Sequence, residues 1–164
     1  MSLDEQFIQR TYALALQSAE NGFDPFAAIL VKDGKEVAST TDHCILNADP
    51  TAHAELHLIR TFCQEQQLIS LESYTLYCNV EPCIMCSGAI HWARLSRVVY
   101  GVNQSTLKKV SAGKPKPNCR DLINSGGGEI QVVGPILEEE GLAVLQAHPF
   151  RSKKERFRNY WQDR

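Results

Sequence analysis

Two short segments carry the residue types that bind metal ions and move protons. The first is His53-Ala54-Glu55, and the second is Glu81-Pro82-Cys83-Ile84-Met85-Cys86. Cys83 and Cys86 stand three positions apart where Pro82 favours the start of a helix, so both sulfur atoms project from one helix face. Two such thiolates span adjacent corners of a tetrahedral metal site, and a helix N-terminus helps them to ionise.

His53 supplies a third ligand and leaves the fourth position open for water, which is typical of a catalytic zinc site. One neutral imidazole and two thiolates also balance the charge of Zn²⁺. Glu55 lies near the first turn of a predicted helix, where a carboxylate can take a proton from water on the metal. The sequence therefore predicts Zn²⁺ as cofactor, His53, Cys83 and Cys86 as its ligands, and Glu55 as the catalytic proton carrier.

Each part of this pattern also has a simpler interpretation. A Cys-x-x-Cys pair occurs in redox proteins and in structural zinc sites, and a histidine near a helix start is more often a core or capping residue. A structural site would need a fourth ligand at short spacing, for which only His91 and Cys78 are near. The combination favours a catalytic site, and a non-catalytic zinc-binding module and a redox protein remain as alternatives.

The composition is that of a single soluble domain spanning residues 1–164. The chain is 43% hydrophobic and 22% charged, and it has no apolar run long enough for a membrane span. Its first residues lack the basic-then-apolar order of a signal peptide, so we expect a cytoplasmic protein with no membrane partner. The net charge of −2 does not favour nucleic acid as a partner. The basic segment 148–164 is read either as a solvated helix face or as a phosphate-contacting edge.

Hydrophobic periodicity predicts the elements that must position these residues. Asp33-Gly34 between two apolar runs indicates a hairpin, and Asp49 with Pro50 predicts a helix that begins there and ends near Phe62. We expect the segment 108–128 to be mostly loop. The predicted helices are 4–20, 50–62, 82–92, 142–147 and 151–161, the last two forming a C-terminal helical tail over about 142–164, and the predicted strands are 27–31, 36–40, 74–80, 97–102 and 129–133. This alternation predicts a sheet covered by helices.

The two metal-binding segments resemble the signature of the cytidine deaminase-like superfamily, His-x-Glu followed by Pro-Cys-x-x-Cys. The stretches 49–55 and 81–86, together with Pro25-Phe26, are similar to the branch that holds bacterial guanine deaminase and tRNA adenosine deaminase. The resemblance implies a three-layer αβα fold with a central five-stranded mixed sheet. It also implies a homodimer or larger homo-oligomer that removes an exocyclic amino group from a nucleobase or nucleoside.

The same resemblance implies a set of substrate-binding residues, namely Phe26, Asp42, Ala54, Glu81 and Trp92. Trp92 matches the tryptophan that lines the base pocket of guanine deaminase, with simple core packing as an equal alternative. Asp42 stands where the family commonly has an asparagine that binds the base. Because an ionised aspartate only accepts hydrogen bonds, the base edge that faces Asp42 should present donors, unless the loop has shifted and another residue takes this role.

A guanine-like purine or a related aminated heterocycle is therefore the first expectation for the substrate. The chain departs from guanine deaminase near Lys114 and in its C-terminal tail, where Phe157 and Trp161 either dock on the core or cover a pocket. The alternative is a tRNA-specific adenosine deaminase. The chain does not contain the Asn-His pair that is typical of such enzymes, which counts against this alternative. Four lysines are nevertheless able to contact phosphate, namely Lys108, Lys109, Lys114 and Lys116.

Overall fold

The computed structural model describes residues 1–111, 114 and 116–162, which contain a single five-stranded sheet in the order β2-β1-β3-β4-β5. The strands are β1 (Ala27–Lys32), β2 (Lys35–Thr41), β3 (Thr75–Val80), β4 (Arg97–Val102) and β5 (Gln131–Val133). β1 pairs antiparallel with β2 and β3, whereas β3, β4 and β5 are parallel. The sheet is therefore mixed, and the carboxyl ends of its parallel strands meet at one edge.

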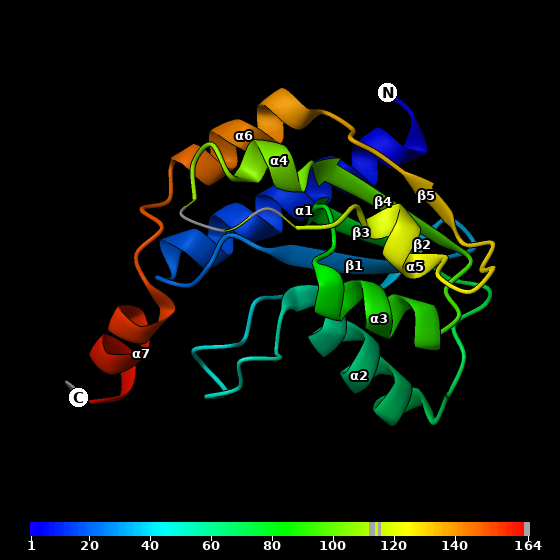
Figure 1. Ribbon diagram of the computed structural model, residues 1–164, viewed down its shortest axis with the longest axis horizontal. Helices are drawn as coiled ribbons and strands as arrows, with labels where there is room; N and C mark the ends of the chain where they lie inside the picture. Colours follow the sequence, from blue (N-terminus) through cyan, green and yellow to red (C-terminus); the bar gives the residue numbers. More distant parts are fainter. Residues whose placement is uncertain (112–113, 115, 163–164) are drawn as a thin grey trace.

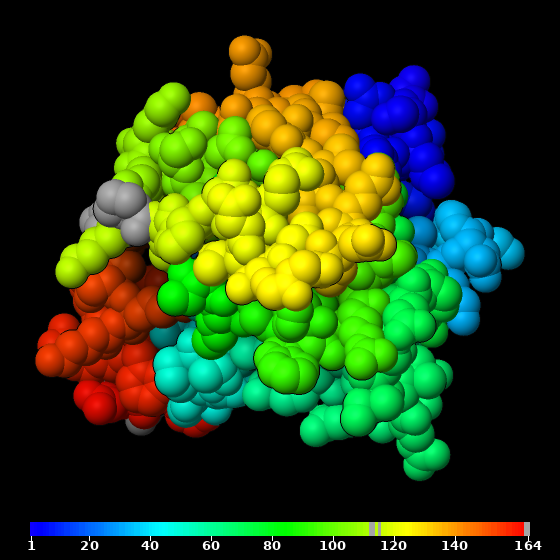
Figure 2. Space-filling view, turned by 45° about the vertical axis from the view of Figure 1, so that its right-hand side comes forward, coloured from blue at the N-terminus to red at the C-terminus, as the bar shows by residue number. Residues whose placement is uncertain are grey.

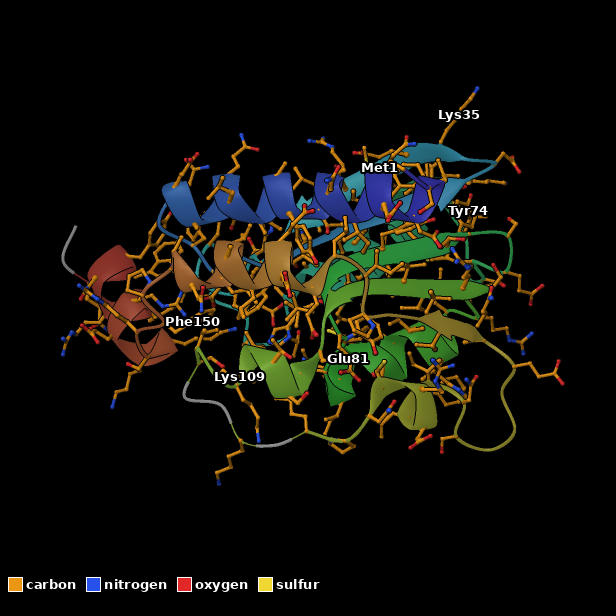
Figure 3. All side chains as sticks on the ribbon, turned by 90° about the horizontal axis from the view of Figure 1, so that it is seen from above. Met1, Lys35, Tyr74, Glu81, Lys109 and Phe150 are labelled. Atoms are coloured by element: carbon orange, nitrogen blue, oxygen red, sulfur yellow. The ribbon has the colours of Figure 1, made fainter. Side chains whose placement is uncertain are left out.

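Helices cover both faces of this sheet. They are α1 (Leu3–Glu20), α2 (Ala54–Gln66), α3 (Ile84–Trp92), α4 (Gln104–Leu107), α5 (Cys119–Ile123), α6 (Glu138–Gln146) and α7 (Lys153–Trp161). In Figure 1, α1 and α6 lie on one face while α2 and α3 lie on the other, with α5 beside α3. Figure 3 shows α1 and α6 side by side. This arrangement confirms the predicted three-layer αβα fold. Among the described helices, none combines the length and apolar character that crossing a membrane requires.

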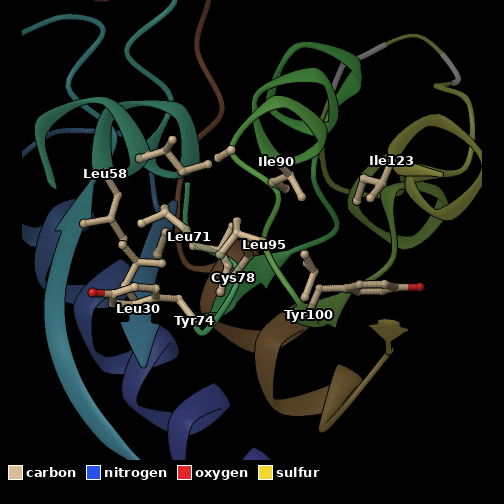
Figure 4. Packing of buried hydrophobic residues seen from close by; sticks show 14 of the residues in the cluster. Leu30, Leu58, Leu71, Tyr74, Cys78, Ile90, Leu95, Tyr100 and Ile123 are labelled. Carbon is tan, nitrogen blue, oxygen red and sulfur yellow. The ribbon is translucent and has the colours of Figure 1, made fainter. Parts of the chain in front are cut away.

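An apolar cluster on each face of the sheet holds the layers together. Along β1, Ala28 and Leu30 join the cluster under α2 and α3, whereas Ile29 and Val31 join the cluster under α1 and α6. Figure 4 shows the first cluster, in which Leu30 lies with Leu58, Cys78 and Ile90. Because both faces of β1 are buried, its sequence is a continuous apolar run instead of an alternating one.

The helix that carries Glu55 begins later than the sequence pattern predicts. α2 starts at Ala54 with His53 at the N-cap position. Asp49 instead accepts hydrogen bonds from the backbone N–H and the hydroxyl of Thr51, at 2.8 and 2.6 Å. The prediction of a helix start at Asp49 and Pro50 is therefore wrong, because the same residue types also form a local turn. The later start places His53 and Glu55 at the open end of the helix.

Two further helices differ from the expectation for the second half of the chain. The segment 108–128 contains α5, which begins after Asn118, whose side chain accepts a hydrogen bond from the backbone of Arg120. α6 begins at Glu138 instead of 142, and it contains Gly141, a weak helix former. A Cβ at Gly141 would collide with Val102 and Tyr12, so close packing requires glycine there. Residues 112–113, 115 and 163–164 of these segments lie outside the described residues.

α7 stands apart from the three layers. None of its residues is buried, and it projects from the end of the molecule opposite the N-terminus (Figure 1). Figure 2 shows the helix in red against the segment that precedes α2, in cyan. Hydrophobic burial therefore does little to hold α7 in place.

We expect Gly101→Ala to destabilise the protein. A Cβ at Gly101 in β4 would lie 2.8 Å from the backbone oxygen of Asn79 and would also meet the hydroxyl of Tyr12. Because the strand backbone cannot move freely, the free energy of unfolding should fall by about 2 kcal/mol, measured by urea denaturation. The loss should be smaller in a Tyr12→Phe background, which lacks the hydroxyl. Equal losses in the two backgrounds would contradict this explanation.

Candidate active site

Four side chains from the starts of α2 and α3 meet beside the carboxyl end of β3. His53 and Cys83 occupy the two N-cap positions, and neither side chain caps its helix. The Sγ atom of Cys83 lies 3.5 Å from Nδ1 of His53, and the Sγ atom of Cys86 lies 3.5 Å from Oε2 of Glu55. The donor atoms of His53, Cys83 and Cys86 all lie within 4.8 Å of one another. This spacing suits three corners of a tetrahedral zinc site.

The two cysteines differ sharply in acidity. A hydrogen bond from Cys86, helped by a second from His53, lowers the pKa of Cys83 to about 3. The same contact with Cys83, together with burial, raises the pKa of Cys86 far above its ordinary value. The hydrogen bond to Cys83 also raises the pKa of His53. The two adjacent sulfur atoms therefore ionise together only when a cation lies between them.

Glu55 is a buried carboxyl group with its ionisation shifted toward neutral pH. Only 9% of the residue is exposed. Burial, followed by the negative charge of Cys83, raises the pKa of Glu55 to about 7. A carboxyl group with this pKa can both hold and release a proton near neutral pH, which is the property a general acid–base residue needs.

His53, Glu55 and Cys83 line a cavity of about 570 Å³. Phe26 from the start of β1 and Phe150 from the segment before α7 also line it, with their ring centroids 6.2 Å apart. The volume lies in the range of sites for small organic molecules, and the aromatic pair supplies apolar surface for a flat ring. The arrangement therefore combines a metal-ligand cluster, a proton carrier and a cavity for a planar heterocycle.

The family model for the cytidine and deoxycytidylate deaminase zinc-binding region matches residues 1–102, which include all four of these side chains. The chain belongs to this deaminase family. The deaminase is 31% identical over 144 residues to a probable cytosine deaminase of Schizosaccharomyces pombe, covering 85% of this chain and 88% of that one. It is 33% identical over 153 residues to a tRNA-specific adenosine deaminase of Buchnera aphidicola, covering 92% and 91%.

Further similarities extend to guanine deaminases. The deaminase is 39% identical over 102 residues to the guanine deaminase of Bacillus subtilis, covering 62% of this chain and 65% of that one. A solved structure of guanine deaminase from Nitrosomonas europaea has the same fold, with a TM-score of 0.77 at 21% identity over 87% of this chain and 82% of that one. The relatives thus share hydrolytic deamination and differ in the base on which they act.

The donor set of the deaminase fits the zinc of its family. A borderline-soft dication prefers imidazole nitrogen and thiolate sulfur, which are the atoms that His53, Cys83 and Cys86 present. When bound, Zn²⁺ supplies Lewis acidity that makes a water molecule acidic enough to lose a proton near neutral pH.

Among the expected substrate-binding residues, Phe26 and Glu81 line the cavity, whereas Ala54 is fully buried in the first turn of α2. Glu81, labelled in Figure 3, uses both carboxylate oxygens within the protein. They accept hydrogen bonds from the backbone N–H groups of Gln104 and Cys119, each at 3.0 Å. Glu81 therefore holds the chain at Gln104, which lines the cavity, and at Cys119. A substrate contact of Glu81 stays a prediction, because each carboxylate oxygen can accept a second hydrogen bond.

Asp42 is buried next to His53 and does not line the main cavity. Its Oδ1 accepts a hydrogen bond from the backbone of Cys44 at 3.1 Å, and its Oδ2 lies 3.7 Å from Nζ of Lys153. Lys153 thus lies against Asp42 and also lines the cavity. Recognition of a base edge by Asp42 stays a prediction.

Trp92 lies at the exposed end of α3, where 81% of the residue is accessible to solvent. The buried side of α3 is formed by Cys86, Ser87 and Ile90, and Trp92 points elsewhere. In the single chain Trp92 neither lines the cavity nor packs in the core, so the core-packing alternative is wrong and a contact of Trp92 with the base stays a prediction.

Asn79 is a site residue that sequence reasoning missed. Its Oδ1 accepts a hydrogen bond from the backbone of Ala27, and its Nδ2 donates to the carbonyl of Pro25, both at 2.8 Å. These bonds hold the turn that presents Phe26 to the cavity. The available signal was a single amide inside the apolar strand β3, since a buried polar side chain must find hydrogen-bond partners.

The basic tail is neither a simple solvated face nor a docked core helix. Arg156 forms an ion pair with Asp24 at 2.8 Å, a residue that sequence reasoning also missed. Trp161 is 48% exposed and donates its indole N–H to the carbonyl of Ile45 at 2.7 Å, and Phe157 is only partly buried. The expectation of a docked core is therefore wrong for this helix, because its charged residues make the inward contacts.

We expect Cys86→Ser to lower the zinc content of the purified, reduced protein from about one ion per chain to a small fraction of that. Serine is similar in size but remains protonated and binds zinc weakly. Metal analysis by inductively coupled plasma mass spectrometry measures the change. Cys63→Ser is the matched control, since Cys63 is a partly buried cysteine of α2 outside the donor cluster, and it should keep its zinc. Full zinc content in Cys86→Ser would remove Cys86 from the ligand set.

Proposed function

We propose that this deaminase acts on a free nucleobase or nucleoside, with guanine-like purines and related aminated heterocycles tested first, alongside cytosine. The observation that carries the proposal is the position of Glu55, buried beside the metal-ligand cluster in a cavity of about 570 Å³ that α7 bounds on one side. A cavity of this volume suits a small molecule. The similarity to relatives named as cytosine and guanine deaminases supports the same substrate class.

In this proposal His53, Cys83 and Cys86 bind Zn²⁺, and Glu55 moves the proton. As water attacks the ring carbon that bears the amino group, a carbon–oxygen bond forms, and Glu55 accepts one proton of the water and passes it to the adjacent ring nitrogen. Glu55 then moves the remaining hydroxyl proton to the amino nitrogen, the carbon–nitrogen bond breaks, and ammonia leaves the oxo base. The raised pKa of Glu55, about 7 before metal binds, supports both halves of this transfer.

The alternative substrate is an adenosine within tRNA. Lys116 and Arg151 line the cavity and are exposed at its rim, where they are able to contact phosphate. Several relatives named as tRNA-specific adenosine deaminases cover more than 90% of this chain. Against this, Lys153 and Arg156 are engaged with Asp24 and are not free for phosphate.

We also propose that the deaminase forms a homodimer through the exposed face of α3. Ile84, Gly88 and Trp92 follow one another at four-residue intervals along this helix. Ile84 is 58% exposed and Trp92 is 81% exposed, while no atom lies within 4 Å of a Cβ placed on Gly88. An apolar stripe with a glycine at its centre suits close approach of a second copy, which would also stiffen the helix that carries Cys83 and Cys86.

Glu55→Gln should keep its zinc and lose catalysis. The amide fills the same space but cannot carry the proton, so we expect kcat to fall by about 10²- to 10⁴-fold. Ammonia release by the wild-type protein and the variant is measured with guanine, guanosine, cytosine, cytidine, adenine, aminated triazines and an anticodon stem-loop.

The wild-type protein decides between the alternatives. Wild-type activity confined to the stem-loop would transfer the assignment to tRNA editing. Zinc binding by the wild-type protein with no activity on any substrate would favour a non-catalytic module, and a reversible disulfide with little zinc would favour a redox protein.

Trp92→Glu should convert the dimer to a monomer. A charge in the centre of an apolar contact carries a desolvation cost that the interface cannot recover. Size-exclusion chromatography with light scattering measures the mass. Ile69→Glu is the control, because Ile69 is 93% exposed and lies outside α3. A monomeric wild-type protein, or a dimer unaffected by Trp92→Glu, would contradict the proposed interface.

A further inference from the structure

The C-terminal helix α7 forms a wall of the cavity without belonging to the hydrophobic core. Phe150, Arg151, Ser152, Lys153 and Arg156 all line the cavity, although no residue of α7 is buried. Figure 3 shows Phe150 beside α7, at the end of the molecule. Phe150 packs against the apolar cluster under α1 and α6, whereas interactions other than core packing must keep α7 itself in position.

Those interactions converge on one carboxylate. Asp24 follows α1 in the loop before β1, and its side chain is only 2% exposed. Nη1 of Arg156 lies 2.8 Å from Oδ1, and Nη2 of Arg156 donates a hydrogen bond to Oδ2 at 2.9 Å, so the guanidinium and the carboxylate form a close ion pair. Nζ of Lys153 lies 3.8 Å and Nε2 of His148 lies 3.6 Å from the same carboxylate. Asp24 thus gathers three basic side chains from a single segment, residues 148–156.

We propose that Asp24 is a positioning residue that holds α7 as the wall of the substrate cavity. Asp24 also lines the cavity, but both of its oxygens lie against the Arg156 guanidinium, so we place its role in holding that arginine. A buried carboxylate that loses its partners is costly, and a charged hydrogen bond from Arg156 fixes the position of the helix that carries it. The pair therefore favours one placement of α7 over the alternatives.

A second contact links the same wall to the metal-ligand cluster. Lys153 lies 3.7 Å from Oδ2 of Asp42, and Asp42 in turn lies next to His53. Other contacts of α7 lie away from Asp24, since the Phe23 and Tyr160 rings lie 5.7 Å apart and Trp161 donates a hydrogen bond to the carbonyl of Ile45. Loss of the Asp24 pair should therefore loosen α7 while the three-layer fold stays intact.

The test compares Asp24→Asn, Arg156→Gln and their combination in the full-length, zinc-loaded protein. The first measurement is the rate of tryptic cleavage after Arg151, Lys153, Lys154 and Arg158, the sites that all variants keep, followed by mass spectrometry. We expect each single change to raise this rate about tenfold, and the double change to add little, because both remove the same contact. Glu36→Gln and Arg10→Gln are matched controls, since they break an exposed pair at 3.2 Å that does not line the cavity.

The second measurement is KM and kcat for the best substrate of the panel, and this readout alone rests on the proposed function. We expect KM to rise about tenfold with kcat changed less than about twofold, since a loosened wall weakens binding and leaves Glu55 in place. Unchanged proteolysis in both single variants would overturn the proposal. Faster proteolysis with unchanged KM would make Asp24 a structural contact only and overturn its role at the cavity.

The proposal about Asp24 can still be tested if one variant does not fold or if the proposed function is wrong. If Asp24→Asn does not fold, Arg156→Gln decides the question, because Arg156 lies on a helix with no buried residue. If the wild-type protein deaminates no base or nucleoside, the proposed function fails. The proteolysis rates still report whether Asp24 holds α7.

Discussion

The central feature of the site is a buried cluster of groups that can become negatively charged, two thiols and one carboxyl group. Cys83, Cys86 and Glu55 lie close together, and ionisation of Cys83 raises the pKa of both other groups. Such a cluster is stable with a full set of negative charges only around a cation. The N-termini of α2 and α3 meet at this point, and their dipoles favour the same charges. The fold therefore forms a site that is stabilised by a bound metal ion even without a substrate.

The polar residues near the carboxyl end of β3 serve as scaffold for this centre. Asn79 fixes the turn before β1, and Glu81 fixes the chain at Gln104 and Cys119. In each side chain, both terminal polar atoms form hydrogen bonds within the protein. The resemblance implies substrate binding for Glu81, and the structure adds a scaffold role, because each of its oxygens accepts a hydrogen bond from the backbone.

Local patterns predicted the layers, most strand bounds and the metal-ligand cluster, because these depend on neighbouring residues. β4 was predicted as observed, since an apolar run between polar flanks admits few alternatives. The start of α2 was missed because Asp49 serves equally well in a turn and at a helix cap. The pair of Asp24 with Arg156 spans 132 residues, and no local pattern records such a contact. The core-packing alternative for Trp92 was wrong because residue type does not reveal which helix face is covered.

The division between centre and wall bears on why related chains differ in substrate. The family model ends at residue 102 and includes His53, Glu55, Cys83 and Cys86. Much of the cavity wall lies beyond it, in Gln104, Leu107, Ser111, Lys116 and the segment 150–156. Relatives that share the zinc-binding region are named for cytosine, guanine and tRNA adenosine. Leu107 and Phe150 tie parts of this wall to the core, whereas α7 is held largely by the ion pairs of Asp24. We therefore expect α7 to be the part of the wall that can differ in shape between related chains while the buried charges stay in place.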